Sequence, residues 1–202
     1  FEKEGSRFNK RIEFADKINV WLQNVIHPCT VHIGSDGDPF ASHVYRYFME
    51  HTPDSDQIRY SILTNGLLVD EFHNKIPHVV KRLTKLGVSV DGATKNTYEQ
   101  LRLGGSWEKI QYNLNFIKEL KQQFNFKFEL HMVVQKDNWK EMPTMLELAD
   151  QFNVDIVYFN EIKDWNTGQD IKEVRPPGDS NEYNNIIKQV NQHPKAKTWA
   201  LL

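Results

Sequence analysis

The chain has 202 residues, of which 39% are hydrophobic and 26% charged, and its 25 Lys and Arg against 27 Asp and Glu give a net charge of -2. This length suits one domain with a buried core, and the balanced charge argues against nucleic acid as an electrostatic partner. No apolar run approaches a membrane span and no secretory signal is present, so we expect a cytoplasmic protein without a membrane partner. The single cysteine, Cys29, excludes an internal disulfide framework.

The first half of the chain alternates helical and strand patterns. Apolar residues recur at three- and four-residue steps in the helical stretches, whereas the strands are short and rich in β-branched residues. In chain order we expect a helix at 8–25, a strand at 30–34, a helix at 39–51 with Pro39 in its first turn, a strand at 58–64, and helical periodicity at 68–83 that Pro77 breaks.

The second half continues the alternation. We expect a strand at 86–91, a short helix after it, a helix at 106–123, a strand at 126–132, a helix at 137–152, a strand at 154–160 and a helix at 182–190 within a loop-rich tail. Strands that alternate with helices predict an α/β fold with a parallel sheet and right-handed crossovers, either doubly wound or curled toward a barrel.

Polar residues follow the carboxyl end of each predicted strand, where ligands bind in parallel α/β proteins. They are Ser35, Asp36 and Asp38; Thr64 and Asn65; Ser89 and Asp91; Gln135, Asp137 and Asn138; and Asn160, Glu161 and Lys163. Taken singly, Asn-Gly and Gly-Asp-Pro are ordinary turn sequences, and Asp91 before Gly92 is equally consistent with a cap. Together, five polar strand ends favour a binding site.

Other signatures are weak or missing. His27, Cys29 and His32 lack zinc-site spacing, and we predict no metal ligands. The sequence has no GxGxxG, P-loop, HExxH or GxSxG motif. Trp107 and Trp139 lie on predicted apolar helix faces, which favours packing over base stacking.

Five segments in this order resemble the radical S-adenosylmethionine enzymes, most closely the SPASM or twitch type. They are "GSDGDPFAS", "ILTNG", "VSVDGATKNTYEQLRLGGSWEKIQYNL", "FELHMVVQKDN" and "VDIVYFNEI", within roughly residues 14–163. The resemblance implies a partial TIM barrel with S-adenosylmethionine across the strand ends. It also implies that the cofactor is cleaved reductively to a deoxyadenosyl radical, which abstracts hydrogen from a peptide or small-molecule substrate.

The resemblance assigns cofactor contacts to particular residues. Gly37, Asp38 and Pro39 match the family's glycine-glycine-glutamate segment, with Asp38 in place of the commoner Glu, and their backbone carbonyls are expected to accept from the methionine ammonium. Ser89 and Asp91 are expected to face the methionine carboxylate and the ribose hydroxyls. Arg102 is expected to bind the carboxylate of the cofactor with its guanidinium group. The remaining expected contacts are Thr64, Asn65, Met132 and Asn160, the last two near the adenine.

One departure from the family is decisive for activity. The family's iron-sulfur cluster needs three cysteines in a CxxxCxxC motif, and this chain has one cysteine. We therefore expect an interior fragment of a longer enzyme, with a barrel core at 1–163 and a loop-rich segment at 164–202 leading toward an extension, which is inactive by itself. The alternatives are a cluster-less barrel acting as a binding module, and a metal-dependent aldolase or hydrolase barrel.

Overall fold

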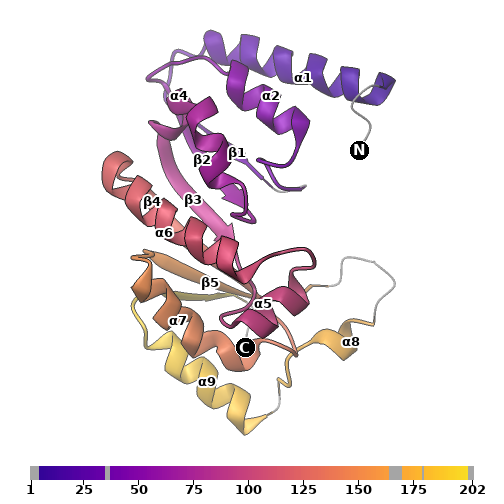
Figure 1. Ribbon diagram of the computed structural model, residues 1–202, viewed down its shortest axis with the longest axis vertical. Coiled ribbons are helices and arrows are strands. Elements are labelled where there is room, and N and C mark those ends of the chain that lie inside the picture. The colour runs from indigo at the N-terminus through magenta and orange to yellow at the C-terminus, as the bar shows by residue number, and fades with distance from the viewer. Residues whose placement is uncertain (1–4, 35–36, 164–169, 179, 200–202) are drawn as a thin grey trace.

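The computed structural model describes residues 5–34, 37–163, 170–178 and 180–199, which are organised around one parallel sheet (Figure 1). Six strands pair in sequence order: β1 Cys29–Ile33, β2 Ile58–Thr64, β3 Leu83–Ser89, β4 Lys127–Val134, β5 Ile156–Glu161 and β6 Ala196–Trp199. Right-handed crossovers between parallel strands in sequence order place the connecting helices on one face of the sheet. The predicted α/β class is confirmed, and the open sheet is consistent with a partial TIM barrel.

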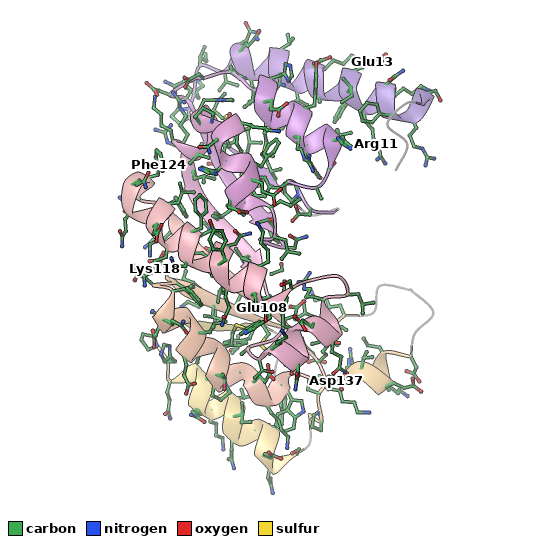
Figure 2. All side chains as sticks on the ribbon, viewed as in Figure 1. Arg11, Glu13, Glu108, Lys118, Phe124 and Asp137 are labelled. Carbon is green, nitrogen blue, oxygen red and sulfur yellow. The ribbon has the colours of Figure 1, made fainter. Side chains whose placement is uncertain are left out.

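The first helix precedes β1, and the other helices lie in the connections between the strands. They are α1 Ser6–Gln23, α2 His43–His51, α3 Val69–Phe72, η1 His73–Lys75, α4 Pro77–Val80, α5 Lys95–Leu101, α6 Trp107–Phe124, η2 Trp139–Glu141, α7 Met142–Gln151, α8 Ile171–Val174 and α9 Asn181–Asn191. Arg11 and Glu13 are exposed side chains of α1 and lie on different sides of the helix (Figure 2). None of the helices in the described ranges has the length and apolar character needed to cross a bilayer.

The two faces of the sheet differ in chemistry. In β4, Phe128, Leu130, Met132 and Val134 are 0% exposed and belong to the core between the sheet and the helices. Successive side chains of a strand point to opposite faces, so Glu129 and His131 lie on the face away from the helices. We call this second face the inner face. The strand pairing gives it a polar set from four strands: Ser61, Lys85, Ser89, Glu129, His131 and Tyr158.

The structure corrects the predicted helix start at Pro39. Pro39 lies in a turn, and α2 begins at His43 with Ser42 as its N-cap, whose hydroxyl accepts from the Tyr45 amide at 3.4 Å. The Asp38 carboxylate accepts from the amides of Phe40 and Ala41, which holds this stretch in a turn. By contrast, Pro77 stands at the start of α4 and breaks the helical stretch as predicted.

Two strand assignments also differ from expectation. β3 begins at Leu83, which pairs with Tyr60, so the residues before position 86 that continue the helical periodicity already belong to the sheet. It ends at Ser89 rather than 91, because Asp91 has a φ of 60° and leaves the extended region. β6 was not predicted. It pairs with β5 and so adds part of the expected loop-rich tail to the sheet.

Candidate functional site

The parallel topology brings the carboxyl ends of all the strands to one edge, which we call the rim. The rim includes the loop after β1 and the ends of β2, β3, β4 and β5. The cofactor contacts that the sequence resemblance predicts all lie within the described residues: Gly37, Asp38, Pro39, Thr64, Asn65, Ser89, Asp91, Arg102, Met132 and Asn160. Ser35 and Asp36 lie outside the described residues.

The Asp38 side chain joins the loop after β1 to the end of β2. Its Oδ2 accepts from the Thr64 hydroxyl at 2.5 Å and from the Asn65 amide at 2.6 Å. The Thr64 hydroxyl in turn accepts from the Gly66 amide at 3.1 Å. Both side chains therefore hold the rim together and have their hydrogen bonds inside the protein.

The backbone around Asp38 offers acceptors of a different kind. The Asp38 carbonyl accepts from the amides of Ala41 and Ser42. Within the described residues, the carbonyls of Gly37 and Pro39 receive no hydrogen bond, and Gly37 has a φ of 95° that favours glycine. Two carbonyl oxygens are thus left for a donor from outside, such as an ammonium group.

Asp91 is held by several partners at the end of β3. Its Oδ1 accepts from the Val133 amide at 2.7 Å, and its Oδ2 pairs with Arg102 Nη2 at 2.6 Å. Asn138 Nδ2 donates to the carbonyls of Asp91 and Val133, both at 2.8 Å. Burial raises the pKa of Asp91, and the charge of Arg102 and the Val133 amide offset part of that rise.

Arg102 lies just past α5 and combines one satisfied and one unsatisfied donor. Nη2 is paired with Asp91, while Nε is buried and has no partner in the described part of the chain. The side chain is 30% exposed, so it borders both the protein and the solvent. A buried guanidinium N–H without an acceptor is costly, which favours an acceptor supplied by a ligand.

Ser89 and Asn160 share the inner face near the rim, at the ends of β3 and β5. Neither side chain has a hydrogen-bond partner among the described residues. Met132 is not brought to them, because it points to the helix-covered face and is 0% exposed. The structure thus gathers a hydroxyl and an amide on one side of the sheet and places the thioether on the other.

Glu141, in η2, is a rim residue that the sequence did not single out. Its Oε2 accepts from the amides of Ala93 at 2.6 Å and Thr94 at 3.2 Å. Its Oε1 accepts from the hydroxyls of Thr94 at 2.8 Å and Thr97 at 2.5 Å. Glu141 therefore fixes the loop between Asp91 and α5, across 44 to 48 residues of sequence. No local sequence pattern predicts such a contact, because it joins residues from separate βα units.

The described residues contain no group of three or more His, Cys, Asp or Glu side chains arranged to hold a metal ion. Cys29 is a free thiol in β1, at the opposite end of the strand from the rim loop.

Comparison with known proteins shows which solved structures share the fold of this chain. No family model matches the chain. A protein of Archaeoglobus fulgidus described as uncharacterized is 26% identical over 135 residues, covering 66% of this chain and 30% of the relative. Streptococcus suis SuiB bound to precursor peptide SuiA superposes with a TM-score of 0.65 at 12% identity, over 94% of this chain and 42% of SuiB.

Two further structures hold the cofactor that the sequence resemblance implies. SuiB bound to S-adenosylmethionine has a TM-score of 0.56 at 13% identity, over 85% of this chain and 38% of SuiB. Native anSMEcpe with bound AdoMet has a TM-score of 0.51 at 16% identity, over 74% of this chain and 42% of anSMEcpe. The chain thus spans less than half the length of these proteins, and it shares the fold of their matched parts.

Proposed function

We propose that this chain is the S-adenosylmethionine-binding part of a radical S-adenosylmethionine enzyme of the SPASM or twitch type. The observation that carries the proposal is the set of unsatisfied polar groups at the rim. These are the carbonyls of Gly37 and Pro39, the Nε of Arg102 and the side chains of Ser89 and Asn160. Two solved structures of the same fold hold S-adenosylmethionine, which supports the choice of ligand.

The rim groups match the chemistry of the cofactor part by part. The Gly37 and Pro39 carbonyls suit the methionine ammonium, because both are acceptors without a donor. Ser89 and Arg102 suit the methionine carboxylate, since both donate. Asn160 suits the adenine edge, to which an amide both donates and accepts. In this assignment Asp91 contributes chiefly by fixing Arg102, because its own oxygens are already engaged.

The iron-sulfur cluster does not fit this chain. Cys29 is the single cysteine of the sequence, and a cluster of this class needs three thiolates. Bound at such a cluster, S-adenosylmethionine supplies the reactive group that removes hydrogen from a substrate. We therefore assign the cluster to a parent protein and expect this chain to bind the cofactor without cleaving it. A peptide substrate for the parent is supported by the SuiB complex with its precursor peptide, and a small molecule is the alternative.

A non-enzymatic binding module is the second candidate, and the single cysteine is the observation that favours it. Both candidates bind a ligand at the rim. They differ in whether a cluster-bearing parent cleaves S-adenosylmethionine.

The cofactor assignment is tested by titrating the full 202-residue chain with S-adenosylmethionine, using calorimetry and amide NMR shifts. We expect saturable shifts at Gly37, Ser89 and Arg102. Ser89→Ala should weaken binding about 10-fold, the effect of losing a hydrogen bond to a charged group. Ser55→Ala is the matched control, because Ser55 lies before β2 at the other end of the sheet. Shifts that avoid the rim, or equal losses in both variants, would refute the assignment.

A further inference from the structure

The inner face carries a second polar site. It begins level with the rim residue Ser89, which pairs with His131, and extends toward the amino ends of the strands. A cavity of about 300 Å³ lies over β1 to β4. We call it the inner-face pocket and define it by His32, Ser61, Lys85, Gly87, Glu129 and His131. Its volume is at the lower end of the range for small-ligand sites.

Glu129 is the buried acceptor of this pocket. Its side chain is 8% exposed, and its Oε1 has no hydrogen-bond partner in the described ranges. Lys85 Nζ lies 3.6 Å from Oε1, and His131 Nε2 lies 3.6 Å from Oε2. Both separations exceed hydrogen-bond distance. A buried carboxylate oxygen is rarely left unsatisfied, because the desolvation cost is large.

The space in the pocket depends on Gly87 and on the position of the His131 ring. A Cβ at Gly87 would lie 2.9 Å from His131 Nε2 and 3.0 Å from Leu63 Cδ1, so a larger residue would push His131 aside. The His131 ring stacks on Tyr158 with centroids 4.9 Å apart. The Lys85 side chain is 48% exposed and can move without disturbing the core.

The charges of the pocket select a neutral ligand. The carboxylate of Glu129 and the ammonium of Lys85 carry opposite charges that cancel. An ionic ligand would leave one charge uncompensated in a partly buried site. A group that donates to Glu129 Oε1 and accepts from Lys85 or His131 would satisfy both sides at once. An amide has this pair of functions in one planar unit.

We propose that the inner-face pocket binds an amide group, with Glu129 as acceptor and Lys85 or His131 as donor. The site does not depend on the proposed cofactor, because its residues are separate from the rim groups assigned to S-adenosylmethionine.

The test uses the full chain at pH 8, with the His131 ring signals followed by NMR. The probes are N-methylacetamide, acetate and methylammonium. We expect N-methylacetamide to give a saturable shift of His131 and to bind at least threefold more tightly than either ion. Ions that bind as tightly as the amide, or an amide that gives no saturable shift, would overturn the proposal.

Variants identify the acceptor. Glu129→Met removes both oxygens while keeping the length of the side chain, and should lower the affinity for N-methylacetamide at least fivefold. Glu129→Gln keeps one acceptor oxygen and should lose less affinity than Glu129→Met, because a neutral hydrogen bond remains where the charged one stood. Glu119→Met, on the exposed side of α6, is the control. Undiminished binding by a folded Glu129→Met variant would overturn the assignment. S-adenosylmethionine titrated into the same samples should still shift the rim amides, which separates failure here from failure of the proposed function.

Discussion

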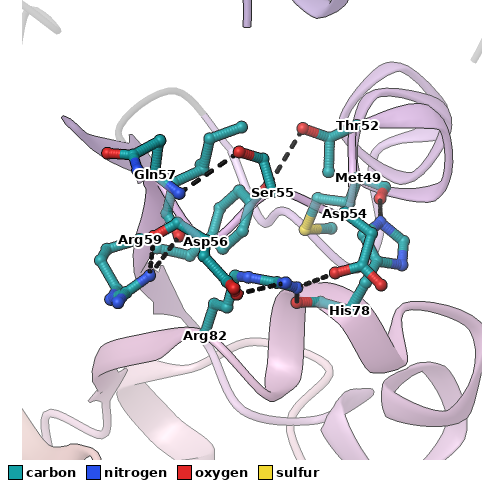
Figure 3. Close-up of polar contacts among 11 residues, drawn as sticks. Met49, Thr52, Asp54, Ser55, Asp56, Gln57, Arg59, His78 and Arg82 are labelled. Carbon is teal, nitrogen blue, oxygen red and sulfur yellow. Dashed lines mark hydrogen bonds and ion pairs between the residues drawn. The ribbon is translucent and has the colours of Figure 1, made fainter. Parts of the chain in front are cut away.

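The two ends of the sheet differ in how completely their polar groups are satisfied within the protein. At the amino end, Arg82 pairs with Asp54 and Asp56, and its Nη1 donates to the His78 carbonyl, although its Nε has no partner in the described part of the chain (Figure 3). At the carboxyl end, backbone carbonyls and several side chains are left without partners. Groups that are satisfied inside the protein stabilise the fold, whereas unsatisfied ones are available to a ligand.

Cavity size alone does not single out the rim. A cavity of about 590 Å³ lies at the amino end, between Arg59, Arg82, Lys121 and Asp155. Most of its charges are already paired: Asp155 accepts from Lys121 at 2.9 Å and from the Phe128 amide at 2.8 Å. Ion pairs of this kind suit the amino-terminal face of a barrel-like sheet, where residues contribute to stability. The predictions below test this division of roles.

The largest effect is expected for Asp91→Ala at the rim. The substitution removes the acceptor of the Val133 amide and leaves Arg102 without its counter-charge. The free energy of unfolding should therefore fall by about 3 kcal/mol. Urea unfolding measures the loss, with exposed Asp137→Ala as control. A loss equal to that of the control would show that the Asp91 contacts do not support the fold.

Among substitutions at the amino end, Arg82→Ala should have the largest effect on the free energy of unfolding. Arg82 is 7% exposed, so the change removes packing as well as two ion pairs. We expect a loss of about 2 kcal/mol in unfolding free energy, because the two aspartates left behind are solvated. S-adenosylmethionine affinity should not change. Arg59→Ala, which affects an exposed guanidinium, is the control. Weaker cofactor binding in Arg82→Ala would break the proposed separation between the two ends.

Glu141→Ala should cost about 1 to 2 kcal/mol and loosen the loop after Asp91, because four hydrogen bonds lose their acceptor at a half-buried position. Glu141→Gln should recover more than half of the loss, since its amide can still accept from the backbone and donate to the threonine hydroxyls. Hydrogen exchange of the Ala93 and Thr94 amides reports the loop directly. Exchange that is unchanged in Glu141→Ala would contradict the role, and Glu147→Ala on exposed α7 surface is the control.

The smallest effect concerns pH at the amino end. Burial tends to raise the pKa of Asp155, but Lys121 and the Phe128 amide outweigh it and lower the pKa overall. Its contribution to stability is therefore present above the unfolded pKa and is lost as the pH falls below about 4. Asp155→Asn should flatten the acid dependence of stability by less than about 1 kcal/mol. An unchanged acid profile, matching that of Asp137→Asn, would show that the pair contributes nothing.

The edge of the sheet that carries the candidate site could be predicted, because strand ends are recognised from local sequence. A polar residue after an apolar strand marks this edge, and Asp38, Ser89, Asp91 and Asn160 lie there. The sequence could not predict which of these side chains are already hydrogen-bonded inside the protein. Asp38 and Thr64 are 26 residues apart in sequence yet bonded, and Asp91 is bonded to Val133 across 42 residues. Met132 was assigned to the site, but strand alternation turns it toward the helices.

The sequence by itself determined the βα alternation, the parallel sheet and the edge on which polar groups collect, because apolar periodicity and turn residues act over a few positions. The start of α2 was decided by the contacts of Asp38 with its neighbours, and β6 required a partner strand to define it. The inner-face pocket depends entirely on the tertiary structure. Ser61, Lys85, Glu129 and His131 come from three strands, and only their register places a buried carboxylate beside an ammonium and an imidazole.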